Sequence, residues 1–369
     1  MVSSGPPILI EHKDMAIIRK LSCSINPALT TVFCLSLPLM AGAVGQTWER
    51  NLDFILLYII QAIGLNIILG YTGLLNLGFA AFYGCGAYCY ALLASPHLGI
   101  HLPALAILPI SGLASAILGL IIGAPALRLK GDYFALVTIG FGQVFIDLIN
   151  NLNHPVNITN GPQGILNIDP FKILGIDFSS QLMVGRFRLS SLQLHYYLFL
   201  AVIIALVYMC HLLKNNYIGR AFMAIRENEI AARACGIKPY RYKMLSFFLG
   251  AFCSGVGGAL FAELQGFVSP SSFNLLESFN ILTIVILGGS ESMVGIVASC
   301  VFMLSVPELL RSWLPVIEQL ITTDNQSSSW VRNLLDPEII RQSIIGAAIV
   351  LMATFRPNGI FSERRKPLK

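Results

Sequence analysis

The sequence predicts an all-α polytopic membrane protein with about 10 transmembrane helices (8–10), whose N- and C-termini both face the cytoplasm. Composition is the first observation behind this fold class. Of the 369 residues, 55% are hydrophobic and only 12% are charged, whereas a soluble domain is charged at roughly 25% of its positions. The mean hydropathy of +0.72 agrees. The second observation is the recurrence of long apolar runs, and the third is the placement of the basic residues.

Apolar runs near the roughly 20 residues that cross a bilayer recur along most of the chain. In chain order we place them at 28–45, 52–69, 74–94, 102–124, 132–150, 195–213, 244–263, 273–289, 293–310 and 339–355. These runs define a transmembrane domain over residues 28–355, flanked by a cytoplasmic segment 1–27 and a basic cytoplasmic tail 356–369. Two long connections stand out, an external loop at 151–194 and a cytoplasmic loop at 214–243. A further external loop is expected at about 311–338.

The orientation follows from the basic residues, which accumulate in cytoplasmic loops. With ten spans and the N-terminus inside, 17 of the 24 lysines and arginines fall on the cytoplasmic side. Seven of these 17 lie in the single loop 214–243.

Within that loop, residues 218–235 read as a short amphipathic helix. Asn216 is a possible N-cap, Gly236 suits the left-handed residue after a helix end, and Pro239 prevents continuation. One row of the helix carries charge and another is apolar, namely Arg226, Glu229 and Arg233 in the first and Met223, Ile230 and Ala234 in the second. Glu229 and Arg233 are spaced for an i,i+4 ion pair. Such a helix is a solvated loop segment, a helix on anionic lipid, or a docking element whose apolar row enters a partner's groove.

The third span is unusually rich in glycine. Gly78 and Gly84 lie in it with Asn76 near its start, and glycine at such density permits either close helix packing or an unwound segment that lines a cavity. Gln143 and Glu263, within or at the end of spans, are the other candidates for a solute pathway. In the seventh span, Gly250, Ser254 and Gly258 form a small-residue face that predicts helix packing.

The chain lacks the motifs of several enzyme classes. ATP hydrolysis needs a glycine-rich loop closing on Gly-Lys-Ser/Thr, and this sequence contains no Gly-Lys dipeptide. Its six histidines are scattered singly, and we expect no metal site, no catalytic residue and no cofactor in this chain. Nothing in the sequence indicates nucleic-acid binding. Energy for transport must come from a partner or from an ion gradient.

Six segments, in order, resemble the LivM-type permease subunits of branched-chain amino-acid ABC importers. They are GYTGLLNLGFAAFYGCGAY (70–88), LRLKGDYFALVTIGFGQV (127–144), TNGPQGI (159–165), GGALFAELQGFVSPSSF (257–273), LTIVILGGSES (282–292) and FRPNGIF (355–361). Residues 230–236 also resemble the family's cytoplasmic coupling loop, Glu-Ala-Ala, three residues, then Gly, with the acidic residue one position earlier at Glu229.

The resemblance implies a function and a set of partners. The chain would be a multi-pass subunit in a bacterial inner membrane that moves leucine, isoleucine or valine inward. It would pair with a second, LivH-like permease, two ATPase subunits that bind ATP and Mg, and a periplasmic substrate-binding protein. The residues that would contact the ATPase are Arg226, Glu229, Ile230, Ala231, Ala232, Arg233 and Gly236.

Two alternatives stay open. Related importers of urea, amides or other amino acids share much of this pattern. An ion-gradient-driven secondary transporter would instead need intramembrane acidic pairs and would have no use for an amphipathic cytoplasmic helix.

Overall fold

The computed structural model describes residues 45–97, 99–129, 131–153, 157–173, 176–178, 182–184, 187–289 and 292–321, with isolated positions near both ends. The predicted segments 1–27 and 356–369 lie outside the described residues, as does most of each of the predicted spans 28–45 and 339–355. The chain divides into two compact units, Met1–Glu49 and Arg50–Lys369. Apart from the first residues of α3, every element named below belongs to the second unit.

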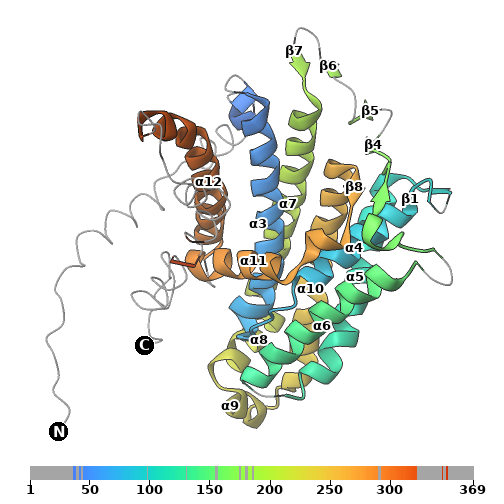
Figure 1. Ribbon diagram of the computed structural model, residues 1–369. Coiled ribbons are helices and arrows are strands. Elements are labelled where there is room, and N and C mark those ends of the chain that lie inside the picture. The colour runs from blue at the N-terminus through green and yellow to red at the C-terminus, as the bar shows by residue number, and fades with distance from the viewer. Residues whose placement is uncertain are drawn as a thin grey trace, which may run out of the picture. The chain divides into compact units, whose positions relative to one another are not determined.

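Six helices in the described part of the chain are long and apolar enough to cross a membrane. They are α3 (Gln46–Thr72), α5 (Ala104–Ala126), α6 (Asp132–Asn151), α7 (Ser191–Asn215), α10 (Pro239–Gln265), and α11 (Leu275–Gly288) together with the preceding 3-10 turn η2 (Pro270–Phe273). Helix α4 (Ala80–Leu93) is a shorter apolar helix, as is the apolar part Met293–Leu309 of α12 (Met293–Ile321). Each of the eight predicted runs from 52–69 to 293–310 therefore coincides with a helix (Figure 1). An all-α membrane fold is confirmed.

In the part of the chain that the structure describes, the strands are short pairs in the connections between helices. The antiparallel pairs are β1 (Ala94–Ser95) with β2 (Ile100–His101), β3 (Ile165–Leu166) with β8 (Phe267–Val268), β4 (Lys172–Ile173) with β5 (Ile176–Asp177), and β6 (Leu182–Val184) with β7 (Phe187–Leu189). A 3-10 turn, η1 (Gly161–Gln163), precedes β3. The β3–β8 pair matters most, because it ties the connection between α6 and α7 to the end of α10 through the register Ile165↔Val268.

The core is built around α10, which packs most extensively against α5 and α4. Burial separates central helices from peripheral ones. Of the most apolar 18-residue stretch of each helix, 78% is buried in α3 and 67% in α10, against 33% in α6 and 28% in α7.

Small residues let the central helices approach backbone to backbone. A Cβ at Gly86 of α4 would lie 2.1 Å from the carbonyl oxygen of Gly255, and one at Gly258 of α10 would lie 2.1 Å from that of Tyr83. Gly250 meets Gly64 of α3 in the same way, 2.8 Å from its carbonyl oxygen. The packing role predicted for the small-residue face of α10 is confirmed.

A buried polar tie joins α3 to α10. Ser254 Oγ donates to Gln61 Oε1 at 2.6 Å, and Gln61 Nε2 donates to the Ser254 carbonyl at 3.1 Å. Both side chains are almost fully buried, so the two hydrogen bonds satisfy groups that lipid or apolar side chains could not.

Two predicted boundaries are wrong. The third span was placed at 74–94, but α4 begins only at Ala80, and residues 73–79 after α3 are non-helical. Helix α12 continues to Ile321, through the beginning of the external loop predicted at 311–338. The hydropathy profile recognises apolar residues in both places, but it does not register a change of backbone conformation within an apolar stretch.

Candidate functional site

The charged segment within residues 214–243 contains two helices rather than the single helix predicted over 218–235. Helix α8 (Tyr217–Glu227) and helix α9 (Glu229–Ala234) are separated by Asn228, whose extended backbone breaks the first helix and caps the second. Asn228 Oδ1 accepts from the backbone N–H groups of Ile230 and Ala231, at 2.9 and 3.1 Å. A short polar side chain competes well with the helical backbone for such donors, which is why the chain bends here.

Both predicted helix ends of the segment are confirmed. Asn216 is the N-cap of α8, and its side chain accepts from the N–H of Tyr217. Gly236 has φ +81°, and the N–H of Ile237 donates to the Ala232 carbonyl at 3.1 Å, which together form a Schellman-type end to α9. Pro239 does more than stop a helix, since it occupies the first turn of α10.

Glu229 is the electrostatic centre of the segment. Its carboxylate accepts from Arg233 at 2.6 Å, the predicted i,i+4 pair, and from Lys243 Nζ at 2.6 Å. The hydrogen bond from Lys243, followed by that from Arg233, holds the pKa of Glu229 below its usual range against the opposing effect of partial burial. Because Lys243 lies on α10, this carboxylate fastens α9 to the start of a membrane-spanning helix.

Arg226 does not share the outward row of Glu229 and Arg233. Its Nη1 donates to the Gly70 carbonyl at 2.6 Å, in the last turn of α3, where helix carbonyls lack intrahelical partners. Its aliphatic stem lies against Gly73, since a Cβ there would be 3.2 Å from Arg226 Cγ. Gly73 has φ +73° and opens the non-helical stretch 73–79. Arg226 therefore connects the charged segment to this stretch.

The remaining residues predicted to contact an ATPase fall into an exposed group and one buried residue. Ile230 is 81% exposed, and Ala231, Arg233 and Gly236 are exposed as well. Ala232 is buried within this chain and is an anchor for α9, so it presents nothing to a partner. Beside the exposed set lies an open groove of about 470 Å³, lined by Arg233, Gly236, Ile237, Lys238, Pro239 and Tyr240. Its two cationic side chains suit an acidic partner surface.

The non-helical stretch 73–79 contains two of the predicted pathway residues. Asn76 is buried, with its Oδ1 accepting from the N–H of Gly78 at 3.0 Å, while its Nδ2 has no hydrogen-bond partner among the described residues. Gly78 meets α6 at close range, because a Cβ there would lie 2.0 Å from the Thr138 carbonyl oxygen. Thr138 Oγ1 also accepts from the N–H of Leu77 at 3.1 Å. The Thr138 side chain of α6 thus supplies an acceptor for a backbone N–H that has no helical partner in this unwound stretch.

Of the other two predicted pathway residues on α4 and α6, Gly84 is buried in packing and Gln143 is exposed. Gly84 faces aromatic rings, with Phe145 at 2.7 Å and Phe273 at 3.0 Å from an added Cβ, so its smallness serves packing within α4. Gln143 is exposed on α6, and its Nε2 donates to Asp147 Oδ1 at 3.1 Å. It also borders a water-sized hollow shared with Gly78.

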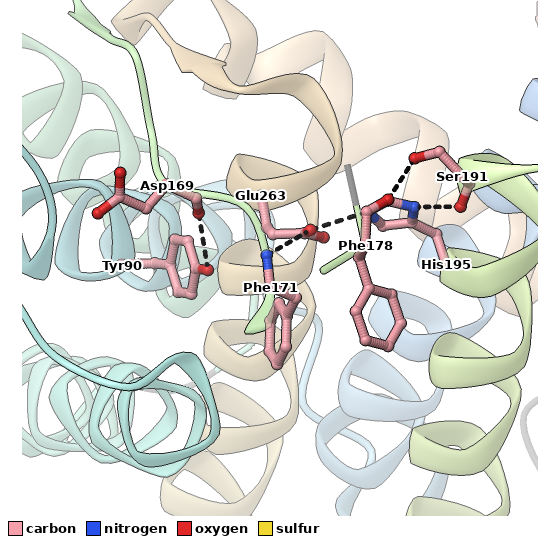
Figure 2. A network of polar contacts seen from close by, with 7 residues as sticks. All are labelled: Tyr90, Asp169, Phe171, Phe178, Ser191, His195 and Glu263. Atoms are coloured by element: carbon pink, nitrogen blue, oxygen red, sulfur yellow. Dashed lines mark hydrogen bonds and ion pairs between the residues drawn. The ribbon is translucent and has the colours of Figure 1, made fainter. Parts of the chain in front are cut away.

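Glu263 belongs to a separate network near the C-terminal end of α10, shown in Figure 2. Its Oε1 lies 2.8 Å from His195 Nε2 and accepts from the N–H of Phe171 at 3.1 Å. His195 Nδ1 in turn lies 2.7 Å from the Ser191 carbonyl oxygen, and Ser191 Oγ donates to the Phe178 carbonyl. The contacts of Glu263, all made through Oε1, join the connection between α6 and α7 to α7 and α10, while Glu263 Oε2 is buried with no hydrogen-bond partner among the described residues.

Sequence reasoning missed three residues that the structure makes important. Lys243 and His195 are the partners of Glu229 and Glu263, and Thr138 supports the unwound stretch. Lys243 was visible as part of the charge block, but its pairing across the Gly236 turn depends on tertiary structure. His195 and Thr138 carried no local signal, because their partners are 68 and 61 residues away.

The fold and these sites define a class of protein, a multi-pass helical membrane protein that combines a tethered, charged segment with an unwound stretch between two apolar helices. Comparison with known proteins gives the family. The family profile described as "Branched-chain amino acid transport system / permease component" matches residues 50–353. The chain belongs to this family.

Individual relatives agree with the family match. The chain is 36% identical over 328 residues to the high-affinity branched-chain amino acid transport system permease protein LivM of Salmonella typhimurium, covering 85% of this chain and 70% of the relative. It is 35% identical over 380 aligned positions to LivM of Escherichia coli K12, covering 99% and 80%. The LivH permease protein of Salmonella typhimurium is 24% identical over 249 residues, covering 64% and 76%. No solved structure matches the chain significantly.

Proposed function

We propose that this chain is the transmembrane permease subunit of an ABC importer that brings branched-chain amino acids into the cytoplasm. The observation that carries this function is the family match, which extends over residues 50–353, together with LivM relatives that align along most of the chain. The chain supplies the passage through the membrane and takes its energy from ATP hydrolysed elsewhere.

The topology and location complete this proposal. The chain spans a bacterial inner membrane with about ten helices and keeps both termini in the cytoplasm. Support comes from the 17 basic residues on one side and from the eight apolar helices of the described part of the chain. The placement of loop 214–243 in the cytoplasm follows from the same count.

The partners are a LivH-like second permease, two ATPase subunits that bind ATP and Mg, and a periplasmic substrate-binding protein. Support for the second permease comes from the similarity to LivH proteins, which by their names serve the same kind of transport system as LivM. The ATPase docks on α9, where Ile230, Ala231 and Arg233 are exposed above the basic groove. Arg226 and Glu229 act from behind this surface, since they bind α9 and its neighbour α8 to α3 and α10.

The solute passes beside the unwound stretch. Asn76 and Gly78 lie in this stretch, and Gln143 is exposed on the helix that supports it. Gly84 and Glu263 serve the pathway indirectly, through packing and through anchoring of the external connection.

Uptake by cells carrying only this copy of the transport system tests the proposal. Labelled leucine, isoleucine, valine and urea would be supplied in turn, with ATP depleted by arsenate or the ion gradient collapsed by a protonophore. We expect leucine, isoleucine and valine to enter, and entry to stop on ATP depletion but to continue without the gradient. Entry of urea alone would reassign the substrate, and loss of entry with the gradient alone would mean a secondary transporter.

A further inference from the structure

One face of α6 is exposed along the whole helix. The exposed residues follow helical spacing and are Tyr133, Leu136, Gly140, Gln143, Val144, Asp147 and Leu148. The opposite face, which includes Thr138 and Gly142, packs against the unwound stretch. The exposed face is mostly apolar, but Gln143 and Asp147 form a hydrogen-bonded carboxylate–amide pair on it.

Gln143 lies near the middle of α6, and Asp147 lies about one turn before its C-terminal end. The middle of α6 falls between residues 141 and 142, so Gln143 lies about 2 Å and Asp147 about 8 Å from it at 1.5 Å per residue. Half the hydrocarbon thickness is about 15 Å. An ionisable side chain at this depth is costly in lipid and is found facing a bundle interior or a water-filled cavity.

Helix α5 offers a comparison within the same chain. Its exposed large residues are all aliphatic, among them Leu105, Leu113, Ile117 and Ile121, with Ile117 55% and Ile121 63% exposed. Helices α5 and α6 are both apolar spans, yet only α6 presents a carboxylate and an amide at its exposed middle. The difference indicates that the α6 face does not contact lipid tails.

A hollow next to Gln143 supports the same conclusion. Its volume is about 10 Å³, room for about one water molecule. Polar groups reach it from three elements, with Gln143 on α6, Asn274 and Ser278 at the beginning of α11, and Gly78 in the unwound stretch. Most of the lining is apolar, but the three polar side chains lie beside the exposed Gln143–Asp147 pair and give a single water hydrogen-bonding partners there.

We propose that the α6 face centred on Gln143 and Asp147 lines a hydrated solute pathway, and that the Asp147 carboxylate contacts the ammonium group of an amino-acid substrate. Gln143 orients this carboxylate by donating to Oδ1 at 3.1 Å, and among the described residues Oδ2 has no hydrogen-bond partner. A carboxylate oxygen accepts charge-assisted hydrogen bonds from an ammonium group, while Leu136, Val144 and Leu148 on the same face suit an aliphatic side chain. The assignment of an amino-acid ligand rests on the proposed function.

Cysteine accessibility tests whether the face is hydrated. In the complete transporter, with exposed Cys235 replaced by serine, Q143C and D147C would be treated with a membrane-impermeant methanethiosulfonate carrying a trimethylammonium group. The matched control is I117C on the exposed aliphatic face of α5. We expect labelling of Q143C and D147C at least ten-fold faster than of I117C, and slower labelling in saturating leucine. Labelling no faster than that of I117C would place the face against lipid or protein and overturn the proposal.

Transport by charge variants tests the ammonium contact. D147N is expected to lower the maximal rate of leucine uptake at least ten-fold at equal amounts of assembled complex, and D147E to restore most of it. A D147N transporter as fast as the parent would refute the contact. That result is distinct from failure of the proposed function, in which the parent transporter itself would not take up leucine, isoleucine or valine.

Discussion

Replacement of Gly78 by alanine tests the contact between the unwound stretch and α6. The added Cβ would lie 2.0 Å from the Thr138 carbonyl oxygen and 2.9 Å from its carbonyl carbon, whereas ordinary contact begins at 3.4 Å. Gly78 is not among the glycines with positive φ, so alanine suits its backbone conformation and the whole effect is steric. Because the obstructing atoms are backbone, no side-chain rotation relieves the clash.

The size of the effect follows from the displacement required. Restoring ordinary contact moves the stretch about 1.4 Å away from α6. This lengthens the hydrogen bond from the N–H of Leu77 to Thr138 Oγ1, now 3.1 Å, beyond bonding range. Overpacking costs about 1–3 kcal/mol and a lost hydrogen bond about 0.5–1.5 kcal/mol, so we expect about 2–4 kcal/mol of destabilisation.

The assay compares Gly78→Ala with Gly140→Ala, since an added Cβ at Gly140 meets nothing within 4 Å. The melting midpoint of the detergent-purified permease would be measured together with leucine uptake per assembled complex. We expect Gly78→Ala to lower the midpoint by several degrees and to slow uptake, and Gly140→Ala to leave the midpoint unchanged. Adding Thr138→Ala should not rescue Gly78→Ala, because the clash is with the Thr138 backbone. Rescue, or equal midpoints for the two glycine variants, would refute the reasoning.

Three further predictions concern other contacts. Ile230→Asp is expected to abolish co-purification of the ATPase subunits without changing the yield of the permease. The reason is that the Ile230 side chain is 81% exposed and supports no packing within this chain. Co-purification of the ATPase with this variant would show that α9 is not the docking surface. The lowered pKa of Glu229 stabilises the junction of α9 with α10 above its usual pKa of 4.5 and ceases to do so as the pH falls through the lowered value, so hydrogen exchange of α9 should rise in acid. This acid step should be absent from Glu229→Gln, and its persistence there would assign it to another group. Ser254→Ala leaves the buried Gln61 Oε1 without its hydrogen-bond donor and should destabilise the purified permease by about 0.5–2 kcal/mol. The double variant Ser254→Ala, Gln61→Leu removes both partners and should recover most of this stability. A double variant as unstable as Ser254→Ala would contradict the described hydrogen bond.

Much of the fold could be predicted from the sequence, because membrane-spanning helices are set by apolar length. The helix cap at Asn216 and the left-handed turn at Gly236 could also be predicted, because both depend only on residues that are neighbours in the sequence. The break at Asn228 escaped prediction because asparagine is tolerated inside helices and its capping role requires that the chain already bend there.

The candidate sites depended more on tertiary structure. The pair Glu229–Arg233 is local and was predicted, whereas the contact of Arg226 with Gly70 joins residues 156 positions apart. A single helix would have placed Arg226 on the row of Glu229 and Arg233, but the break at Asn228 puts Arg226 on α8 and the other two on α9, and Arg226 donates to the Gly70 carbonyl at the end of α3. Sequence periodicity gives the direction of each Cβ along one helix, but it does not identify the acceptor that a long, flexible side chain binds in the folded protein.

The backbone-to-backbone contacts of α4 and α10 limit how this subunit can move. Gly86, Gly255 and Gly258 leave no layer of side chains that could slide or repack, because their neighbours already stand where a methyl group would be. A small rotation of either helix against the other would produce overlap, so we expect α4 and α10 to move together as a single rigid block. Conformational cycling must then be accommodated at the edges of that block. Spin labels placed within it should keep constant separations through the transport cycle, while pairs that bridge from it to α9 or to the stretch 73–79 should report the motion.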